Sequence, residues 1–279
     1  MPFTPAHAVV ALPFLRGPLV PAAIAIGAMT PDLPLFFRVG PGYWTTHSWI
    51  GAFVVDIPLA LLLFLVWRLV LRPAVPQLTP RWLRERWPRE WSGPLLTGWW
   101  DLWGGRDARA SARVRAALLL AFSFLLGIAT HIFWDEFTHE DRWGSEVFPV
   151  LAEHLGPLPL TAWAQYVSSI VGLAVIGVWG VSWMRRAVPH PIEPVVPRWF
   201  VIVAWMLVPV ALAVLVAIAL PALGMPETVV ELRLLAERVG KAWGASILVI
   251  AAIASVVVVL AKARHARDVP KFAGPPDST

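Results

Sequence analysis

The sequence predicts an all-α fold: a polytopic helical membrane bundle with about five spans and a short N-terminal helix that is re-entrant or buried. Hydrophobic residues make up 58% of the 279 residues and charged residues 15%, whereas soluble domains have roughly 45–50% and about 25%. Several apolar runs approach or exceed the roughly 20 residues that cross the hydrocarbon core. Basic residues stand at the ends of these runs, so the net charge of +5 indicates membrane topology.

The first 18 residues contain too many prolines for a long regular helix, and they lack the basic start of a cleavable signal peptide. His7 lies in this arm. Residues 19–30 form a short helix candidate, and a run of this length is more typical of a re-entrant or core helix than of a span. It ends at Pro31 and Asp32, where the carboxylate either caps a turn or faces a site. The sequence leaves open whether residues 19–30 cross the membrane.

Five longer apolar runs are predicted to span the membrane: 50–71, 114–135, 161–184, 199–222 and 243–262. The connections at 72–115 and 185–198 and the carboxyl tail are basic, so the positive-inside rule places them in the cytoplasm. The acidic segment 136–160 then faces outward, together with 223–242, which is expected to form a short amphipathic surface helix. We expect a single integral membrane domain over 1–265, with a cytoplasmic Arg/Trp-rich loop at 72–113, and a disordered tail at 266–279.

Three polar side chains recur every four residues where the second predicted span ends: His131, Asp135 and His139. On a continuing helix they rise along one face, and imidazole nitrogen and carboxylate oxygen at that spacing can hold a divalent metal ion. The alternative for His131 and Asp135 is a buried ion pair along the helix. His139 lies one turn further out and is expected at the rim. Because the chain has no cysteine, any metal site must use nitrogen and oxygen ligands.

The predicted topology brings further ligands to the same outer side of the membrane. His47 and Asp32 closely precede the first span, and His7 joins them if residues 19–30 are re-entrant. Five metal ligands are therefore expected for one divalent ion, zinc first, or for a two-metal pair: His7, Asp32, His47, His131 and Asp135. The structural alternatives are a hydrogen-bonding role for His7 and a helix start at His47, with Ser48 as its N-cap. Glu136 and Asp141 are the candidates for a catalytic general base, and nothing in the sequence chooses between them.

Arginine and tryptophan alternate in the loop at 72–113, a pattern that can provide stacking platforms for nucleic acid. Beside apolar spans the same pattern is more typical of a segment that contacts lipid headgroups through aromatic anchors. We therefore expect membrane lipids as partners and no nucleic acid. The oligomeric state is left open.

Four motifs resemble a bacterial membrane family catalogued as domain of unknown function 4184. They are the opening Met1-Pro2-Phe3-Thr4-Pro5-Ala6-His7, the turn Gly27-Ala28-Met29-Thr30-Pro31-Asp32, the motif Thr130-His131-x-x-Trp134-Asp135-x-Phe137-Thr138-His139, and Gln165-Tyr166-x-Ser168-Ser169-x-x-Gly172. The family is more distantly similar to membrane-bound metal-dependent hydrolases. That resemblance implies metal ligation by His7, by Asp32, by His47 in Thr46-His47-Ser48, and by His131 and Asp135.

Two functions are compatible with these observations. The first is a metal-dependent hydrolase in a bacterial cell (inner) membrane, with its site on the outer side, its carboxyl terminus in the cytoplasm, and an amphipathic, lipid-like ester or phosphoester as substrate. The second is a non-enzymatic scaffold or transport-related protein in which the same residues form a structural metal site or a proton relay. An open coordination position distinguishes them, because a catalytic zinc keeps water and a structural zinc does not.

Overall fold

The computed structural model describes residues 3–37, 40–93, 99–100 and 102–268, and these residues are mostly helical. Within these described ranges, five helices are long and apolar enough to cross a membrane: Trp49–Leu78, Ala110–Thr138, Leu160–Arg186, Arg198–Ala222 and Val229–Arg267. Each contains one of the five predicted spans. The all-α fold class and the multi-pass membrane character are therefore confirmed.

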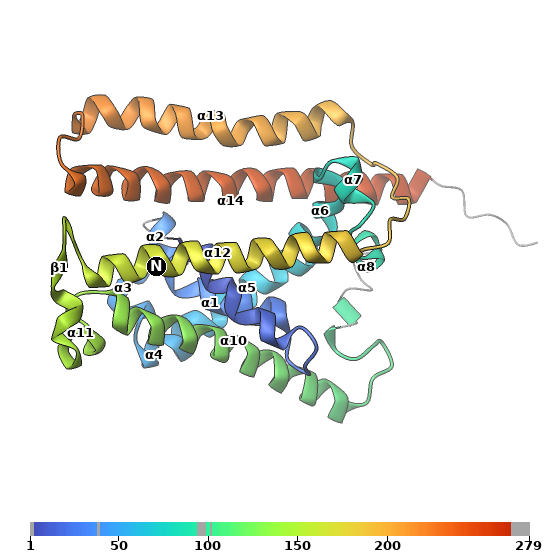
Figure 1. Ribbon diagram of the computed structural model, residues 1–279. Coiled ribbons are helices and arrows are strands. Elements are labelled where there is room, and N and C mark those ends of the chain that lie inside the picture. The colour runs from blue at the N-terminus through green and yellow to red at the C-terminus, as the bar shows by residue number, and fades with distance from the viewer. Residues whose placement is uncertain (1–2, 38–39, 94–98, 101, 269–279) are drawn as a thin grey trace, which may run out of the picture.

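The first span is a composite helix. Its segments are α4 (Trp49–Gly51), the π-helix η3 (Ala52–Asp56), α5 (Ile57–Val66), a second π-helix η4 (Trp67–Leu71) and α6 (Arg72–Leu78). The other spans are α10 (Ala110–Thr138), α12 (Leu160–Arg186), α13 (Arg198–Leu223) and α14 (Val229–Asp268). In Figure 1, α13 and α14 run side by side along the upper edge, and α12 packs against η1 of the amino-terminal arm.

One expected element is wrong. The segment 223–242 does not form a separate surface helix, because α14 runs without a break from Val229 to Asp268. The connection between α13 and α14 is short, and Gly224 turns it with a φ of 81°. No proline interrupts residues 229–262, so the charged first turns and the apolar run continue as one helix.

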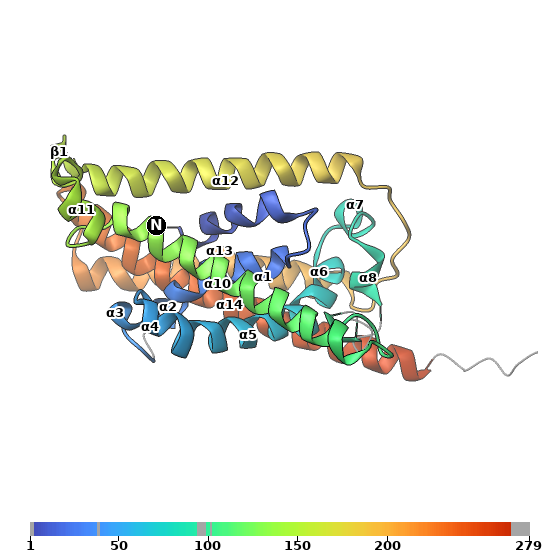
Figure 2. The same cartoon turned by 90° about the horizontal axis from the view of Figure 1, so that it is seen from below.

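The amino-terminal arm folds back on itself inside the bundle. It consists of the 3₁₀-helix η1 (Thr4–Phe14), α1 (Pro21–Met29), the 3₁₀-turn η2 (Thr30–Asp32) and α2 (Leu33–Phe37), followed by α3 (Tyr43–Thr46). Figure 2 shows η1 and α1 lying between α12 and α10. The chain enters at Thr4 and returns at Asp32, and the Thr4 hydroxyl donates to Asp32 Oδ2 at 2.7 Å. The arm therefore places His7 and Asp32 at one end of the bundle.

The short helix α1 crosses α10 at very close range. A Cβ added to Gly27 would lie 2.5 Å from the Phe124 carbonyl oxygen. One added to Gly127 would lie 2.7 Å from Ala28 N and closer still to the Ile24 carbonyl oxygen. Small residues on both helices permit such an approach of two backbones. The crossing fixes α1, and with it Asp32, relative to α10.

A compact apolar core surrounds this crossing. Its buried side chains come from α1, η3, α5 and α10: Ala23, Ala52, Ala60, Phe64, Leu120, Phe124, Ile128 and Ile132. In contrast, no residue in the apolar stretch of α13 is buried inside the protein. The bundle thus has its solid core around α1, and α13 is the most peripheral of the five spans.

The remaining elements lie at the two ends of the bundle. At one end are α11 (Trp143–Val147), the 3₁₀-helix η5 (Pro149–Ala152) and a small antiparallel pair of β1 (His154–Leu155) with β2 (Leu158–Pro159). At the other end the Arg/Trp-rich segment contains α7 (Arg81–Arg84) and α8 (Arg89–Ser92), where Trp87 stacks on Trp91. The expected disordered tail begins in the last turn of α14 and otherwise lies outside the described residues.

Candidate metal centre

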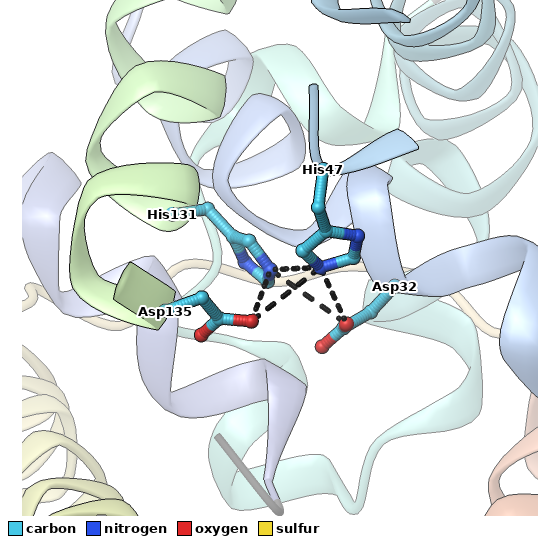
Figure 3. Close-up of side chains that lie close together, drawn as sticks. All are labelled: Asp32, His47, His131 and Asp135. Carbon is cyan, nitrogen blue, oxygen red and sulfur yellow. Dashed lines mark hydrogen bonds and ion pairs between the residues drawn. The ribbon is translucent and has the colours of Figure 1, made fainter. Parts of the chain in front are cut away.

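Four buried side chains from three separate segments converge at one end of the bundle (Figure 3). Asp32 ends η2, His47 follows α3, and His131 and Asp135 lie one turn apart on α10. One ligand atom from each lies within 4.8 Å of all the others. The two histidine Nε2 atoms are 3.1 Å apart. His47 Nε2 is 3.4 Å from a carboxylate oxygen of each aspartate, and His131 Nε2 is 3.6 Å from the same two oxygens.

The hydrogen bonds behind the two histidines determine which ring nitrogens face the cluster as acceptors. His131 Nδ1 lies 2.8 Å from the Ala28 carbonyl oxygen, and His47 Nδ1 lies 3.0 Å from the Tyr43 carbonyl oxygen. A carbonyl oxygen only accepts, so each Nδ1 carries the proton and each neutral ring presents the Nε2 lone pair inward. Two lone pairs and two carboxylate oxygens thus point at one small volume, the arrangement typical of a cation site.

The two buried carboxylates of the cluster also favour a positive charge beside them. Burial disfavours the ionised Asp32 carboxyl, but His131 and His47 outweigh that effect and lower its pKa. Burial lowers the pKa of His47, yet its contacts with Asp135 and Asp32 prevail and raise it to about 8. A proton on His47 or a bound metal ion can supply this positive charge, and the two compete for the same Nε2 lone pair.

The spacing of the histidine nitrogens from each other and from the two carboxylates suits a small divalent ion. Ligand atoms about 2.0–2.2 Å from a tetrahedral zinc are separated by roughly 3.3–3.6 Å, and the five histidine-containing pairs are 3.1–3.6 Å apart. Nitrogen and oxygen donors also match the donor set predicted for a chain without cysteine. The cluster can therefore hold a metal ion, and the geometry does not identify which one.

His7, the fifth predicted ligand, lies beside the cluster rather than within the group of four. Its ring packs on His131 with the centroids 4.1 Å apart. Its Nε2 is buried and makes no hydrogen bond to the described residues. Burial lowers the pKa of His7 to about 2, so the ring is neutral and the lone pair of its free nitrogen is available to a metal ion.

Neither predicted general base belongs to the four-residue cluster. Glu136 accepts a hydrogen bond from Trp143 N at 3.0 Å and pairs with Arg142 Nη1 at 3.3 Å. Asp141 is exposed, in a turn with a φ of 59°. His139 is about 30% exposed in its side chain and lies 3.5 Å from Asp135 Oδ2, between the cluster and the surface.

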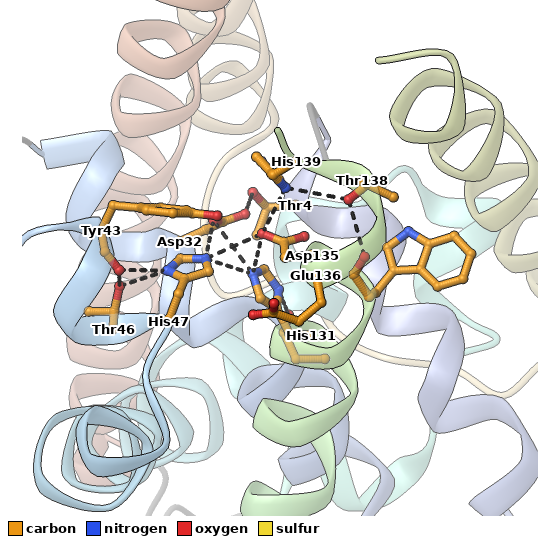
Figure 4. A network of polar contacts seen from close by, with 12 residues as sticks. Thr4, Asp32, Tyr43, Thr46, His47, His131, Asp135, Glu136, Thr138 and His139 are labelled. Atoms are coloured by element: carbon orange, nitrogen blue, oxygen red, sulfur yellow. Dashed lines mark hydrogen bonds and ion pairs between the residues drawn. The ribbon is translucent and has the colours of Figure 1, made fainter. Parts of the chain in front are cut away.

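A shell of hydroxyl and amide groups holds the ligands in place (Figure 4). Thr4 binds Asp32, and the Thr46 hydroxyl lies 3.0 Å from His47 Nδ1. Gln165 of α12 donates to the carbonyl oxygen of Thr138, so the polar residues at the start of the third span bond between helices. Partners of this kind orient metal ligands and raise metal affinity.

Sequence reasoning missed Asp56, a fully buried carboxyl group in the π-helix of the first span. Neither carboxyl oxygen has a hydrogen-bond partner among the described residues. The sequence carried one signal of it, because an aspartate inside an apolar run is costly to desolvate. The structure adds that it lies in a π-helical turn, and such turns are frequent at functional sites. The carboxyl is an acidic group in the span that leads directly from His47.

Comparison with known proteins identifies the family. Residues 1–263 match the family described as Domain of unknown function (DUF4184), which covers most of the chain, so the protein belongs to this family. No curated protein and no solved structure matches the chain. The more distant similarity to metal-dependent hydrolases therefore stays a prediction.

Proposed function

We propose that this DUF4184 protein is a membrane-embedded metal-dependent hydrolase. A divalent ion, zinc first, would be held by Asp32, His47, His131 and Asp135, with His7 as a further ligand. The observation that carries the proposal is the convergence of two imidazole lone pairs and two carboxylate oxygens in one buried volume. Four acceptors at this spacing repel each other unless a cation or protons neutralise them.

A bound divalent ion supplies Lewis acidity and activates water near neutral pH. The chain's own residues would orient the metal ligands and offer the ion a further lone pair. Thr4 holds one oxygen of Asp32 and leaves the other for the cluster. The neutral His7 ring packs beside His131, and its buried Nε2, which has no hydrogen-bond partner among the described residues, would offer the ion a further lone pair.

The substrate side of the proposal rests on the surroundings of the cluster. Exposed aromatic side chains surround this end of the bundle, among them Trp44, Phe133 and Trp143. Aromatic belts of this kind lie at headgroup depth. An amphipathic ester or phosphoester would place its polar group at the metal centre and its chains in the lipid. We place the site on the outer side of a bacterial cell membrane, because the segments at the opposite end are basic.

The alternative is a non-enzymatic protein in which the metal is structural. One observation favours it: all four ligands are buried, and four protein ligands can close a tetrahedral zinc site. A scaffold or transport-related role would then use the ion as a cross-link between the amino-terminal arm and α10.

Metal analysis of the purified full chain in detergent, beside His131→Ala, tests both functions. The hydrolase predicts about one bound ion per chain, its loss in the variant, and metal-dependent cleavage of a lipid from a panel of phosphoesters and carboxylic esters. Stoichiometric metal without turnover on the panel, together with unfolding on chelation, supports the structural role. Wild-type protein that retains no metal after reconstitution with zinc, manganese or magnesium refutes the hydrolase and the structural metal, and leaves the proton relay.

A further inference from the structure

Arg142 lies at this same end of the bundle, just before α11, and its side chain is only 9% exposed. Its Nη1 pairs with Glu136 Oε1 at 3.3 Å. The guanidinium lies over two rings, 4.9 Å from the centroid of Trp44 and 5.0 Å from that of Tyr43. It is the one arginine in the acidic segment 136–160, so its charge is isolated in the sequence.

The hydrogen-bonding capacity of Arg142 is only partly used. Nε and Nη2 are buried and have no hydrogen-bond partner among the described residues. Buried polar groups are nearly always paired, so two unused donors on one guanidinium require an explanation. The planar fork of a guanidinium matches the oxygens of a phosphate or carboxylate and binds them in a bidentate manner.

Tyr43 connects this arginine to the metal centre. Its ring stacks on His47 with the centroids 3.9 Å apart, and Figure 4 shows its hydroxyl end directed towards the middle of the cluster. The hydroxyl is likewise buried and has no hydrogen-bond partner among the described residues. Three donors without a hydrogen-bond partner among the described residues, two on Arg142 and one on Tyr43, therefore lie beside the metal ligand His47.

We infer that Arg142 and the Tyr43 hydroxyl form an anion subsite beside the metal cluster, and that it takes the phosphate group of a phosphoester. The inference rests on the proposed function and narrows its substrate class from esters in general to phosphoesters. One phosphate oxygen would face the metal ligands, while a second is bound by Arg142. A carboxylic ester has no anionic oxygen to occupy the fork.

The surroundings of Arg142 favour a lipid as the source of the phosphate. Trp44, whose ring contacts the guanidinium, is 66% exposed, and Trp143, the next residue in the chain, is 56% exposed. Tryptophans exposed at the end of a spanning helix lie at the depth of lipid headgroups. The fork of Arg142 is thus held at the level where a phospholipid carries its phosphate.

Binding of inorganic phosphate to the full chain in detergent micelles, measured by calorimetry with and without zinc, tests the subsite. We compare Arg142→Gln, Arg142→Lys and Tyr43→Phe with the control Arg81→Gln, whose side chain is 86% exposed and lies in α7. Arg142→Gln should weaken phosphate binding roughly 10- to 100-fold, since it removes charged hydrogen bonds. Arg142→Lys, which keeps the charge but not the fork, should recover part of this loss. Tyr43→Phe keeps the ring stacking and should cost a few-fold, and Arg81→Gln should bind as the wild type does.

The same variants are assayed with a short-chain phosphatidic acid, with glycerol phosphate and with a short-chain carboxylic ester. Loss of turnover on both phosphoesters, with bound zinc retained, supports the subsite, and preference for the first of them identifies a lipid source. Phosphate affinity that is unchanged in folded, zinc-loaded Arg142→Gln and Tyr43→Phe overturns it. If no substrate turns over but phosphate binding still depends on Arg142, the hydrolase fails and the anion subsite stands.

Discussion

Replacing Gly127 by alanine adds one methyl group where α10 meets α1 most closely. The new Cβ would lie 2.7 Å from Ala28 N, and closer to the Ile24 carbonyl oxygen, whereas ordinary contact begins near 3.4 Å. The backbones must therefore separate by roughly 1 Å. Ala28 also supplies the carbonyl oxygen that lies 2.8 Å from His131 Nδ1, so this separation stretches the bond that fixes the tautomer of a metal ligand.

Two magnitudes follow from this displacement. Overpacking of a close interface costs about 1–3 kcal/mol, which exceeds the gain of up to about 1 kcal/mol from replacing glycine in a helix. Loss of a hydrogen-bond partner behind a metal ligand typically lowers metal affinity about 10- to 100-fold. We expect Gly127→Ala to lower both the thermal midpoint and the zinc affinity.

The control is Gly177→Ala in α12, where an added Cβ meets nothing within 4 Å. It receives the same gain in helix propensity without the clash, so its midpoint and zinc affinity should match or exceed those of the wild type. Thermal unfolding in detergent and competitive zinc titration with a chelating dye measure the two quantities. Wild-type zinc affinity in Gly127→Ala would show that the α1–α10 crossing does not position His131.

Two further predictions concern Asp56 and the topology. Both carboxyl oxygens of Asp56 are buried without a hydrogen-bond partner among the described residues, so replacing the carboxyl by an amide of the same shape breaks no hydrogen bond. Asp56→Asn should therefore change the unfolding free energy by less than about 1 kcal/mol. A loss of several kcal/mol would indicate a charged carboxylate with a partner. The chain has no cysteine, so single cysteines report membrane sidedness directly. A membrane-impermeant maleimide applied to intact cells should label Glu153→Cys, which lies after η5 at the same end of the bundle as the candidate metal centre. It should label Val188→Cys, at the opposite end, only after lysis. The reverse pattern would place the site in the cytoplasm.

The spans and the core of the site were predictable because their signals are local. Hydropathy marks each apolar run, and the four-residue spacing puts His131 and Asp135 on one helix face. Charge bias then brought His47 and Asp32 to the same side, and the structure unites these four residues. The continuation of α14 was missed because a charged, amphipathic segment and an apolar run carry different patterns even when one helix contains both.

The parts of the site that escaped prediction depend on tertiary contacts. The sequence predicts that residues 19–30 are re-entrant or buried, but not their crossing with α10, because a glycine in an apolar run does not reveal the backbone that it meets. Arg142 could not be distinguished from a solvated loop arginine, because its burial comes from rings at Tyr43 and Trp44, about a hundred positions away. Sequence spacing is informative within a helix and says little across such distances.

The residues of the candidate metal centre lie far apart in the sequence, so they are synthesised, and can meet, in a fixed order. His47 meets His131 across 84 positions, and Ala28 meets it across 103. The amino-terminal arm and the first span are therefore made well before α10 enters the membrane. Until then Asp32 and His47 lack their partners on α10, so a metal ion can join the arm to the bundle only once the second span is in place. The four residues of the candidate centre can therefore come together only after the second span has been inserted.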